Sequence, residues 1–175
     1  MTTGADLAEA AWAARREGRQ EDAEQALIEA IGVARRSGSV RDLIRALKYL
    51  AHVVRDQGQD ERALPLYEEA LALSRSEGDP MLLAHTVRHL GDLHRDVGRL
   101  TDADRCYEEA LLLYRAAPAP KALDFANAVR PAALLKEVQG DVQGARRLWS
   151  EARRLYEGFP EAVAECDRFL CQLGE

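Results

Sequence analysis

The chain has 175 residues, of which 47% are hydrophobic and 31% charged, and its formal net charge at pH 7 is -6. This length fits one ordinary domain that can bury a core without disulfide staples, and the composition excludes intrinsic disorder. The negative charge argues against a protein devoted to nucleic acid, because phosphates would repel it.

An internal repeat runs along the chain, with glycines spaced 40, 40 and 42 residues apart. Each glycine is followed by an alanine after five residues, by a large apolar residue after nine, and by a second alanine after twelve. Four columns that stay in phase over four copies indicate a repeat architecture. The copies are Gly18, Ala23, Leu27 and Ala30; Gly58, Ala63, Tyr67 and Ala70; Gly98, Ala103, Tyr107 and Ala110; Gly140, Ala145, Trp149 and Ala152.

The apolar periodicity around these columns predicts two helices in each copy. The glycine supplies a left-handed turn between them. The two alanines share one face of the second helix, where small side chains let a neighbouring helix approach. In chain order, we expect helices over residues 5–16, 20–36, 40–56, 60–77, 80–96, 100–116, 120–138 and 142–157, and a last helix over 160–173.

Prolines and the chain end modify this scheme. Pro65 lies just past the first turn of its helix, where a missing amide donor does little harm. Pro131 lies in the middle of its helix and should kink or split it. The last helix should cap the repeat with one inward apolar face, formed by Ala162, Cys166, Phe169 and Leu170.

The third copy resembles the tetratricopeptide repeat (TPR). Leu90-Gly91, Ala103, Tyr107 and Ala110 match columns of that family's pattern, and the repeats are longer than the family's usual length of about 34 residues. Val87 and His94 stand where the family has tryptophan and tyrosine. The resemblance implies an all-α fold, a right-handed superhelical solenoid of four TPR-like helix-turn-helix repeats plus a C-terminal capping helix. We expect a single domain over residues 1–175, with repeats at 4–38, 40–79, 80–118 and 120–158 and the capping helix at 160–173.

Catalytic and cofactor motifs are missing from the sequence. It has no G-x-S-x-G, no phosphate-cradling glycine loop and no C-x-x-C pair, so we predict no enzymatic activity and no cofactor. The first ten residues do not resemble a secretory signal, and no apolar stretch approaches the roughly 18 residues of a membrane span. Cys106, Cys166 and Cys171 fall within helical patterns and are interpreted as buried or half-buried apolar side chains. A reducing cytoplasm is the expected location.

The resemblance also implies where a partner would bind, since in this family the second stripe of each first helix lines a concave groove for peptides. The formal charges of the residues in these four stripes sum to +3 when histidine is taken as neutral. The rest of the chain therefore carries a formal charge of -9. We therefore expect a protein- or peptide-binding scaffold or adaptor with a mildly basic groove. Arginine forks would hold an acidic or C-terminal segment, and aromatic side chains would add contact area. The candidate groove residues are Trp12, Arg45, Lys48, Tyr49, His52, Arg55, His85, Arg88, His89, Arg95, Asn127 and Arg130.

Other functions remain open from the sequence alone. His85 and His89 are four residues apart and could ligate a metal in a metal-dependent enzyme, with His52 or Asp92 as a third ligand. No glutamate follows His85, so the zinc-protease helix is absent, and an incidental surface pair is the preferred interpretation. The chain could instead self-associate through its last helix. The same arginines could hold an anionic non-protein ligand such as RNA.

Overall fold

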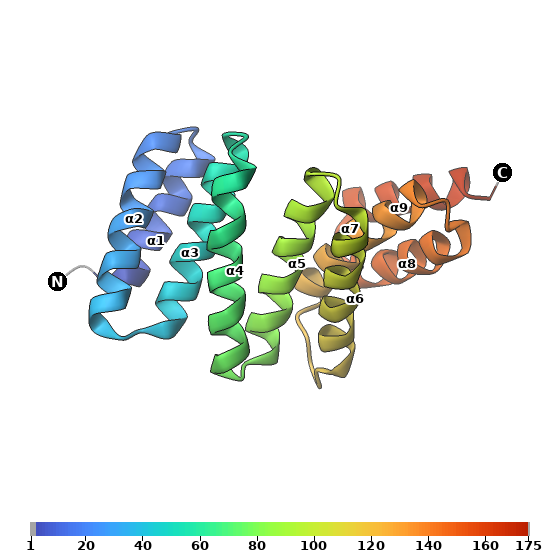
Figure 1. The fold of residues 1–175 in the computed structure, drawn as a ribbon. Coiled ribbons are helices and arrows are strands. Elements are labelled where there is room, and N and C mark those ends of the chain that lie inside the picture. Colours follow the sequence, from blue (N-terminus) through green and yellow to red (C-terminus); the bar gives the residue numbers. More distant parts are fainter. Residues whose placement is uncertain (1–2, 175) are drawn as a thin grey trace. The chain divides into compact units, whose positions relative to one another are not determined.

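The computed structural model describes residues 3–174, and helices alone make up the regular structure of this range. Every predicted helix boundary lies within two residues of the observed one, so the predicted all-α architecture is confirmed. In chain order the helices are α1 (Gly4–Arg16), α2 (Gln20–Ser37), α3 (Val40–Asp56), α4 (Asp60–Glu77), α5 (Pro80–Asp96), α6 (Leu100–Ala116), α7 (Ala122–Val138), α8 (Val142–Leu155) and α9 (Pro160–Gln172) (Figure 1).

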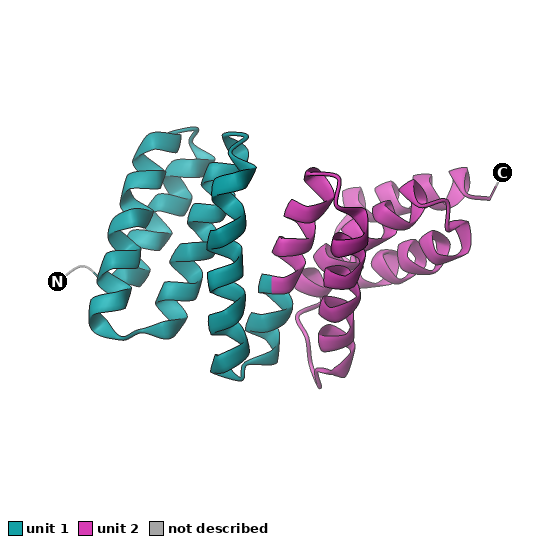
Figure 2. Cartoon of the chain, in the orientation of Figure 1, with its two compact units in different colours: residues 1–86 teal, residues 87–175 magenta. Residues whose placement is uncertain are grey.

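The chain forms two compact units, and the boundary between them falls inside α5. Unit 1 ends at Thr86 and unit 2 begins at Val87 (Figure 2). In unit 1, α3 packs against α2 and α4 and also against α1, the first helix of the preceding hairpin. In unit 2, α7 packs against α6 and α8, and α9 packs against α8. A first helix such as α3 is therefore covered on several sides rather than on one stripe.

The repeat columns form the core of both units, as predicted. The turn glycines Gly18, Gly58, Gly98 and Gly140 have φ between 73° and 78°, the left-handed conformation that favours glycine. Every alanine of the two columns has an exposed fraction of 0%, and the large side chain between them is equally buried. Small alanines thus let the helices approach, and one large residue per repeat packs between them. The large residues are Leu27, Tyr67, Tyr107 and Trp149.

Local side-chain caps explain where several helices begin. Thr3 and Asp6 form a reciprocal capping box at the start of α1, in which each side chain accepts from the other's amide. At the start of α5, Asp79 Oδ1 accepts hydrogen bonds from the amides of Met81 and Leu82 at 3.0 and 3.1 Å. These bonds satisfy amide groups that a helix N-terminus otherwise leaves without partners.

A recurring ion pair joins successive second helices on their outer side. In unit 1, Arg35 of α2 lies 2.7 Å from Glu69 of α4. In unit 2, Arg115 of α6 lies 2.6 Å from Glu151 of α8, at the equivalent positions of the repeat. Exposed pairs of this kind each contribute little, up to about 1 kcal/mol, but they match neighbouring hairpins in charge as well as in shape.

Pro131 does not split its helix, contrary to one of the two outcomes expected for it. α7 continues without a break from Ala122 to Val138, with Pro131 inside it. A proline removes one amide donor, while the hydrogen bonds of the neighbouring turns remain available to hold the helix together. Pro131 is itself buried, so packing of its ring against the core compensates part of that loss.

The last helix caps unit 2 through fewer buried residues than predicted. Cys166 is buried, and Phe169 stacks on Trp149 with ring centroids 4.4 Å apart and an interplanar angle of 4°. Ala162 and Leu170 are half-buried. Cys171 is exposed, so its interpretation as a buried or half-buried side chain is wrong. It lies near the end of α9.

Gly91 marks a close approach of α5 and α6 within unit 2. A Cβ atom at this position would lie 2.9 Å from Tyr107 Cε1 and 3.0 Å from Cys106 Cβ. Real Cβ atoms rarely come this close to their neighbours, so glycine is required here by space and not by its backbone conformation.

Replacing Gly91 by alanine should destabilise the protein. Overpacking costs about 1–3 kcal/mol, which exceeds the ~1 kcal/mol that alanine gains over glycine inside a helix. Gly32→Ala in α2 is the matched control, because its added carbon meets the flexible end of Arg36 at 3.3 Å. Urea unfolding followed by circular dichroism should find that Gly91→Ala is less stable than the wild type and that Gly32→Ala is more stable. An equal gain in stability for both variants would contradict the close approach of α5 and α6.

Candidate functional site

An aromatic stack joins the two first helices of unit 1. Trp12 of α1 stacks on Tyr49 of α3, with ring centroids 4.5 Å apart and an interplanar angle of 23°. Both rings are half-buried, so each keeps an edge in contact with solvent. His52, one turn further along α3, is buried, and its ring centroid lies 5.5 Å from that of Trp12 and 5.8 Å from that of Tyr67, both in edge-type contacts. The stack is a preformed apolar contact with polar atoms at its border.

Two arginines flank this stack, and their environments differ. The guanidinium of Arg15 lies 4.4 Å from the centroid of the Trp12 ring and forms an ion pair of 2.7 Å with Asp56 of α3. The guanidinium of Arg45 lies 3.7 Å from Glu9 Oε1, and 42% of its side chain is exposed. A separation of 3.7 Å is beyond hydrogen-bonding distance. Arg15 is thus held in place, whereas Arg45 can turn to another carboxylate. We call Trp12, Arg45 and Tyr49 the α1/α3 face.

The other candidate residues of unit 1 lie deeper. Lys48 and His52 are buried, with exposed fractions of 9% and 6%, and Arg55 and His85 are half-buried. A stripe taken from the sequence assumes that the first helix of a repeat has one face in the core and one face in solvent. In unit 1, α3 also contacts α1, so part of its second stripe is covered by a neighbouring first helix.

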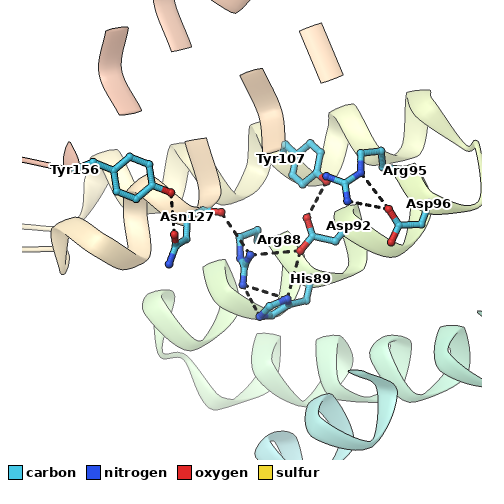
Figure 3. Close-up of polar contacts among 8 residues, drawn as sticks. All are labelled: Arg88, His89, Asp92, Arg95, Asp96, Tyr107, Asn127 and Tyr156. Carbon is cyan, nitrogen blue, oxygen red and sulfur yellow. Dashed lines mark hydrogen bonds and ion pairs between the residues drawn. The ribbon is translucent and has the colours of Figure 1, made fainter. Parts of the chain in front are cut away.

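Unit 2 carries a polar network centred on a buried carboxylate (Figure 3). Asp92 has an exposed fraction of 6%, and its Oδ1 accepts a hydrogen bond of 2.9 Å from the Tyr107 hydroxyl. Its Oδ2 lies 3.3 Å from an Arg88 nitrogen and 3.4 Å from His89 Nδ1. We call Arg88, His89, Asp92 and Tyr107 the Asp92 network. It joins α5 to α6 through charge-assisted contacts.

Arg88 and Tyr107 are the hydrogen-bond donors of the network. One Arg88 nitrogen lies 2.5 Å from His89 Nε2 and 3.1 Å from His89 Nδ1, and a guanidinium can only donate. His89 Nδ1 also lies 3.4 Å from Asp92 Oδ2. Burial, together with the charge of Asp92, raises the pKa of Tyr107 far above its ordinary value. The hydroxyl therefore remains a donor to Asp92.

The remaining candidates of unit 2 also have partners within the unit. Arg95 pairs with Asp96 at 2.8 Å. Asn127 is an exposed residue of α7, and its side-chain Oδ1 accepts a hydrogen bond of 2.9 Å from the Tyr156 hydroxyl. Its backbone carbonyl accepts a hydrogen bond of 3.4 Å from Arg88 (Figure 3). Arg130 of α7 donates two hydrogen bonds, of 2.7 and 3.0 Å, to the carboxylate of Glu165 of α9.

The sequence did not reveal these partners. Glu165 is 35 residues from Arg130, and Tyr156 is 29 residues from Asn127. Neither residue belongs to a first-helix stripe, so the stripes alone give no sign of either contact. The equal spacing of the repeats is the one signal that could have suggested contacts between successive hairpins.

The part of the chain that the structure describes has no candidate metal site and no membrane-spanning helix. Residues 3–174 contain no group of three or more histidine, cysteine, aspartate or glutamate side chains that could hold a metal ion. Across the same range, none of the helices has the length and apolar character needed to cross a bilayer.

Helical hairpins with glycine turns and packed alanine columns define a tetratricopeptide-like helical-repeat protein. The chain belongs to the family of the MalT-like TPR region, whose model matches residues 7–169. No curated protein matches the sequence.

Solved structures share this fold at low sequence identity. BtubC from P. vanneervenii has a TM-score of 0.76 and 20% identity, covering 90% of this chain and 64% of its own. A putative kinesin light chain with TPR-like repeats from Podosopora anserina has a TM-score of 0.74 and 15% identity, covering 99% and 97%. NprR, in complex with its cognate peptide NprX, has a TM-score of 0.76 and 20% identity, covering 97% and 49%. The chain spans less than two thirds of the length of BtubC and of NprR.

Replacing Asp92 by asparagine should cost about 2–4 kcal/mol, because removing one partner of a buried ion pair leaves the other charge uncompensated. The value lies below the top of the usual range because 14% of the Arg88 side chain is exposed. Asp96→Asn, which removes an exposed charge from the same helix, should cost less than about 1 kcal/mol. Urea unfolding of both variants at neutral pH measures the difference. If the two variants lose similar amounts of stability, the Asp92 network contributes no more than an exposed charge does.

The Arg130–Glu165 pair should make stability depend on pH. Its hydrogen bonds lower the pKa of Glu165 below the ordinary value of 4.5. The contribution is therefore present above pH 4.5 and is lost as the pH falls through the lower folded-state value. Glu165→Gln should be less stable than the wild type at pH 7, by up to about 1 kcal/mol, and the gap should close under acid. Thermal unfolding across this pH range tests it, with the exposed Glu157→Gln as control; a gap that persists in acid would contradict the pair's role.

Proposed function

We propose that the chain is a peptide-binding scaffold or adaptor, and that the α1/α3 face makes the principal contact with the peptide. The observation that carries the proposal is the half-buried Trp12–Tyr49 stack beside the partly exposed Arg45. Aromatic pairs with one apolar side and one polar border are typical of binding surfaces. The stack is preformed, so a ligand would lose little free energy in ordering it.

The proposed ligand is an acidic segment or a C-terminal carboxylate of a partner protein. Arg45 supplies the carboxylate contact, since its planar fork can donate two parallel hydrogen bonds once it leaves Glu9. Burial and the nearby Glu9 carboxylate raise the pKa of Tyr49, so its hydroxyl remains available as a donor. Trp12 adds apolar contact area next to these two polar groups.

The candidate residues of unit 2 have two different roles in this proposal. Asn127 is exposed and 43% of the Arg130 side chain is exposed, so both could contact an acidic segment from α7. Arg88, His89 and Arg95 already have partners within the unit, and we assign them to ordering α5 rather than to direct contact. Lys48, His52 and Arg55 are buried or half-buried, and we assign them to the packing of α3 rather than to direct contact.

Comparison with known structures supports a peptide ligand, because NprR, which has the same fold, was solved with its cognate peptide. No catalytic step is proposed. The cytoplasm is the proposed setting, since the three free thiols would remain reduced there.

Charge reversal at Arg45 should weaken peptide binding about tenfold, because a charge-assisted bidentate contact contributes on the order of 1.4 kcal/mol or more. Peptides would be selected by phage display against the wild-type chain, and their affinities measured by fluorescence anisotropy. The selected peptides should be rich in acidic residues. Tyr49→Ala should weaken the same peptides by a similar factor.

The matched control is Arg36→Glu, which reverses an exposed charge on α2 within the same unit. It should leave the affinity unchanged, and circular dichroism should find all variants equally helical. Selected peptides without acidic enrichment, or a selection in which no peptide loses affinity for Arg45→Glu, would refute the α1/α3 face as the site. A steep fall in affinity for RNA with rising salt, together with no peptide selected, would favour the anionic non-protein ligand instead.

A further inference from the structure

A groove on unit 2 lies between α6 and α8, the second helices of two successive hairpins. It has a volume of about 790 Å³, and α7 contributes Ala132 and Lys136 to its lining. Three leucines give it an apolar surface: Leu111 is buried, Leu148 is half-buried, and Leu112 is 66% exposed. An exposed leucine beside buried ones indicates an apolar surface that extends from the core into solvent.

The groove is bordered by a basic helix. α8 carries four arginines and one glutamate within 14 residues, in a chain whose net charge is -6. Arg146, Arg147 and Arg154 line the groove, are exposed, and have no ion-pair partner within residues 3–174. Arg153, the fourth, points elsewhere and pairs with Asp167 of α9.

The acidic residues of the groove are mostly occupied. Asp104 forms an ion pair of 2.7 Å with Lys136, and Glu151 forms one of 2.6 Å with Arg115. Asp141 accepts a hydrogen bond from the amide of Gly144 at the start of α8. Glu108, exposed on the α6 wall, is the remaining acid of the lining. The uncompensated charge of the groove is therefore positive and is concentrated on α8.

We propose that this α6/α8 groove binds an acidic amphipathic helix of a partner protein. Arg147 and Arg154 are seven residues apart, so they lie on the same side of α8, about two helical turns or ~10 Å from each other. Acidic residues seven apart on a bound helix would match that separation. Leucines at intervening positions of the bound helix would pack on Leu112 and Leu148, as in other helix-in-groove complexes.

The length and form of the groove favour a helix over other anionic ligands. A single carboxylate or phosphate would engage one arginine and leave the second, two turns away, without a contact. A flat anionic membrane would reach the exposed arginines but could not enter a groove between two helices. This site is separate from the α1/α3 face and does not depend on it.

The test is a selection from a displayed library of helical peptides, randomised along one face, against the full chain. Recovered peptides should carry acidic residues seven positions apart beside an apolar stripe. Their affinity, measured by anisotropy of a fluorescein-labelled copy, should fall about tenfold for Arg147→Glu/Arg154→Glu, since two attractions become repulsions. Leu112→Asp should weaken binding independently, because it places a charge on the apolar wall.

Arg99→Glu is the matched control: Arg99 is exposed in unit 2, lies outside the groove lining, and has no ion-pair partner in the described range. It should bind the peptides like the wild type, and circular dichroism should find every variant folded. Failure to recover any peptide, absence of the acidic spacing, or equal binding to the double variant would overturn the proposal. Two other results would also overturn it: tighter binding to vesicles of phosphatidylserine and phosphatidylcholine than to the peptides, or a dimer in light scattering that Leu112→Asp dissociates.

Discussion

Close packing of alanine against a neighbouring helix is the interaction on which the rest of this structure depends. A hairpin of two helices cannot bury its own apolar faces, so each hairpin relies on the next one along the chain. The two alanine columns let the helices approach, and one large residue per repeat fills the remaining space. Within this packing α1 also contacts α3, and Trp12 and Tyr49 stack where the two helices meet. The candidate binding face is therefore a consequence of how the hairpins pack.

Ion pairs within each unit decide which arginines can meet a ligand. The chain has more acidic than basic residues, and many of its carboxylates neutralise arginines of a neighbouring helix. In both units this neutralisation reaches the first helices: Asp56 holds Arg15 in unit 1, and Asp92 and Glu165 hold Arg88 and Arg130 in unit 2. Among the described residues of the two candidate binding surfaces, the more weakly paired or unpaired arginines are Arg45 in unit 1 and three arginines of α8 in unit 2. A tally of formal charge along a stripe overestimates the positive potential, because it counts arginines and omits the acids that structure brings to them.

The fold could be predicted in detail because its rules are local and repeated. Glycine at a fixed interval, alanines seven apart and a large residue between them each report a short-range requirement, and four copies confirm one another. Pro131 shows where such local reasoning stops, since one proline in a packed helix did not split it.

The site was harder to predict because its contacts are long-range. Trp12 and Tyr49 could both be selected from their stripes, but their stacking depends on the packing of α1 on α3. The burial of Lys48 and His52 depends on neighbours that a single helical stripe does not represent. The recurrence of Arg35–Glu69 as Arg115–Glu151 suggests that contacts between repeats can be inferred once one of them is known.

The two tryptophans have different environments and lie in different units. Trp12 is half-buried on Tyr49 in unit 1, and Trp149 is fully buried on Phe169 in unit 2. An indole at a wet border and an indole in a dry core emit at different wavelengths, so the intrinsic fluorescence of the unmodified chain contains a separate signal from each half. Repeat arrays lose cooperativity when the coupling between neighbours is weak. The emission spectrum can therefore report, without any label, whether the halves melt together or one after the other.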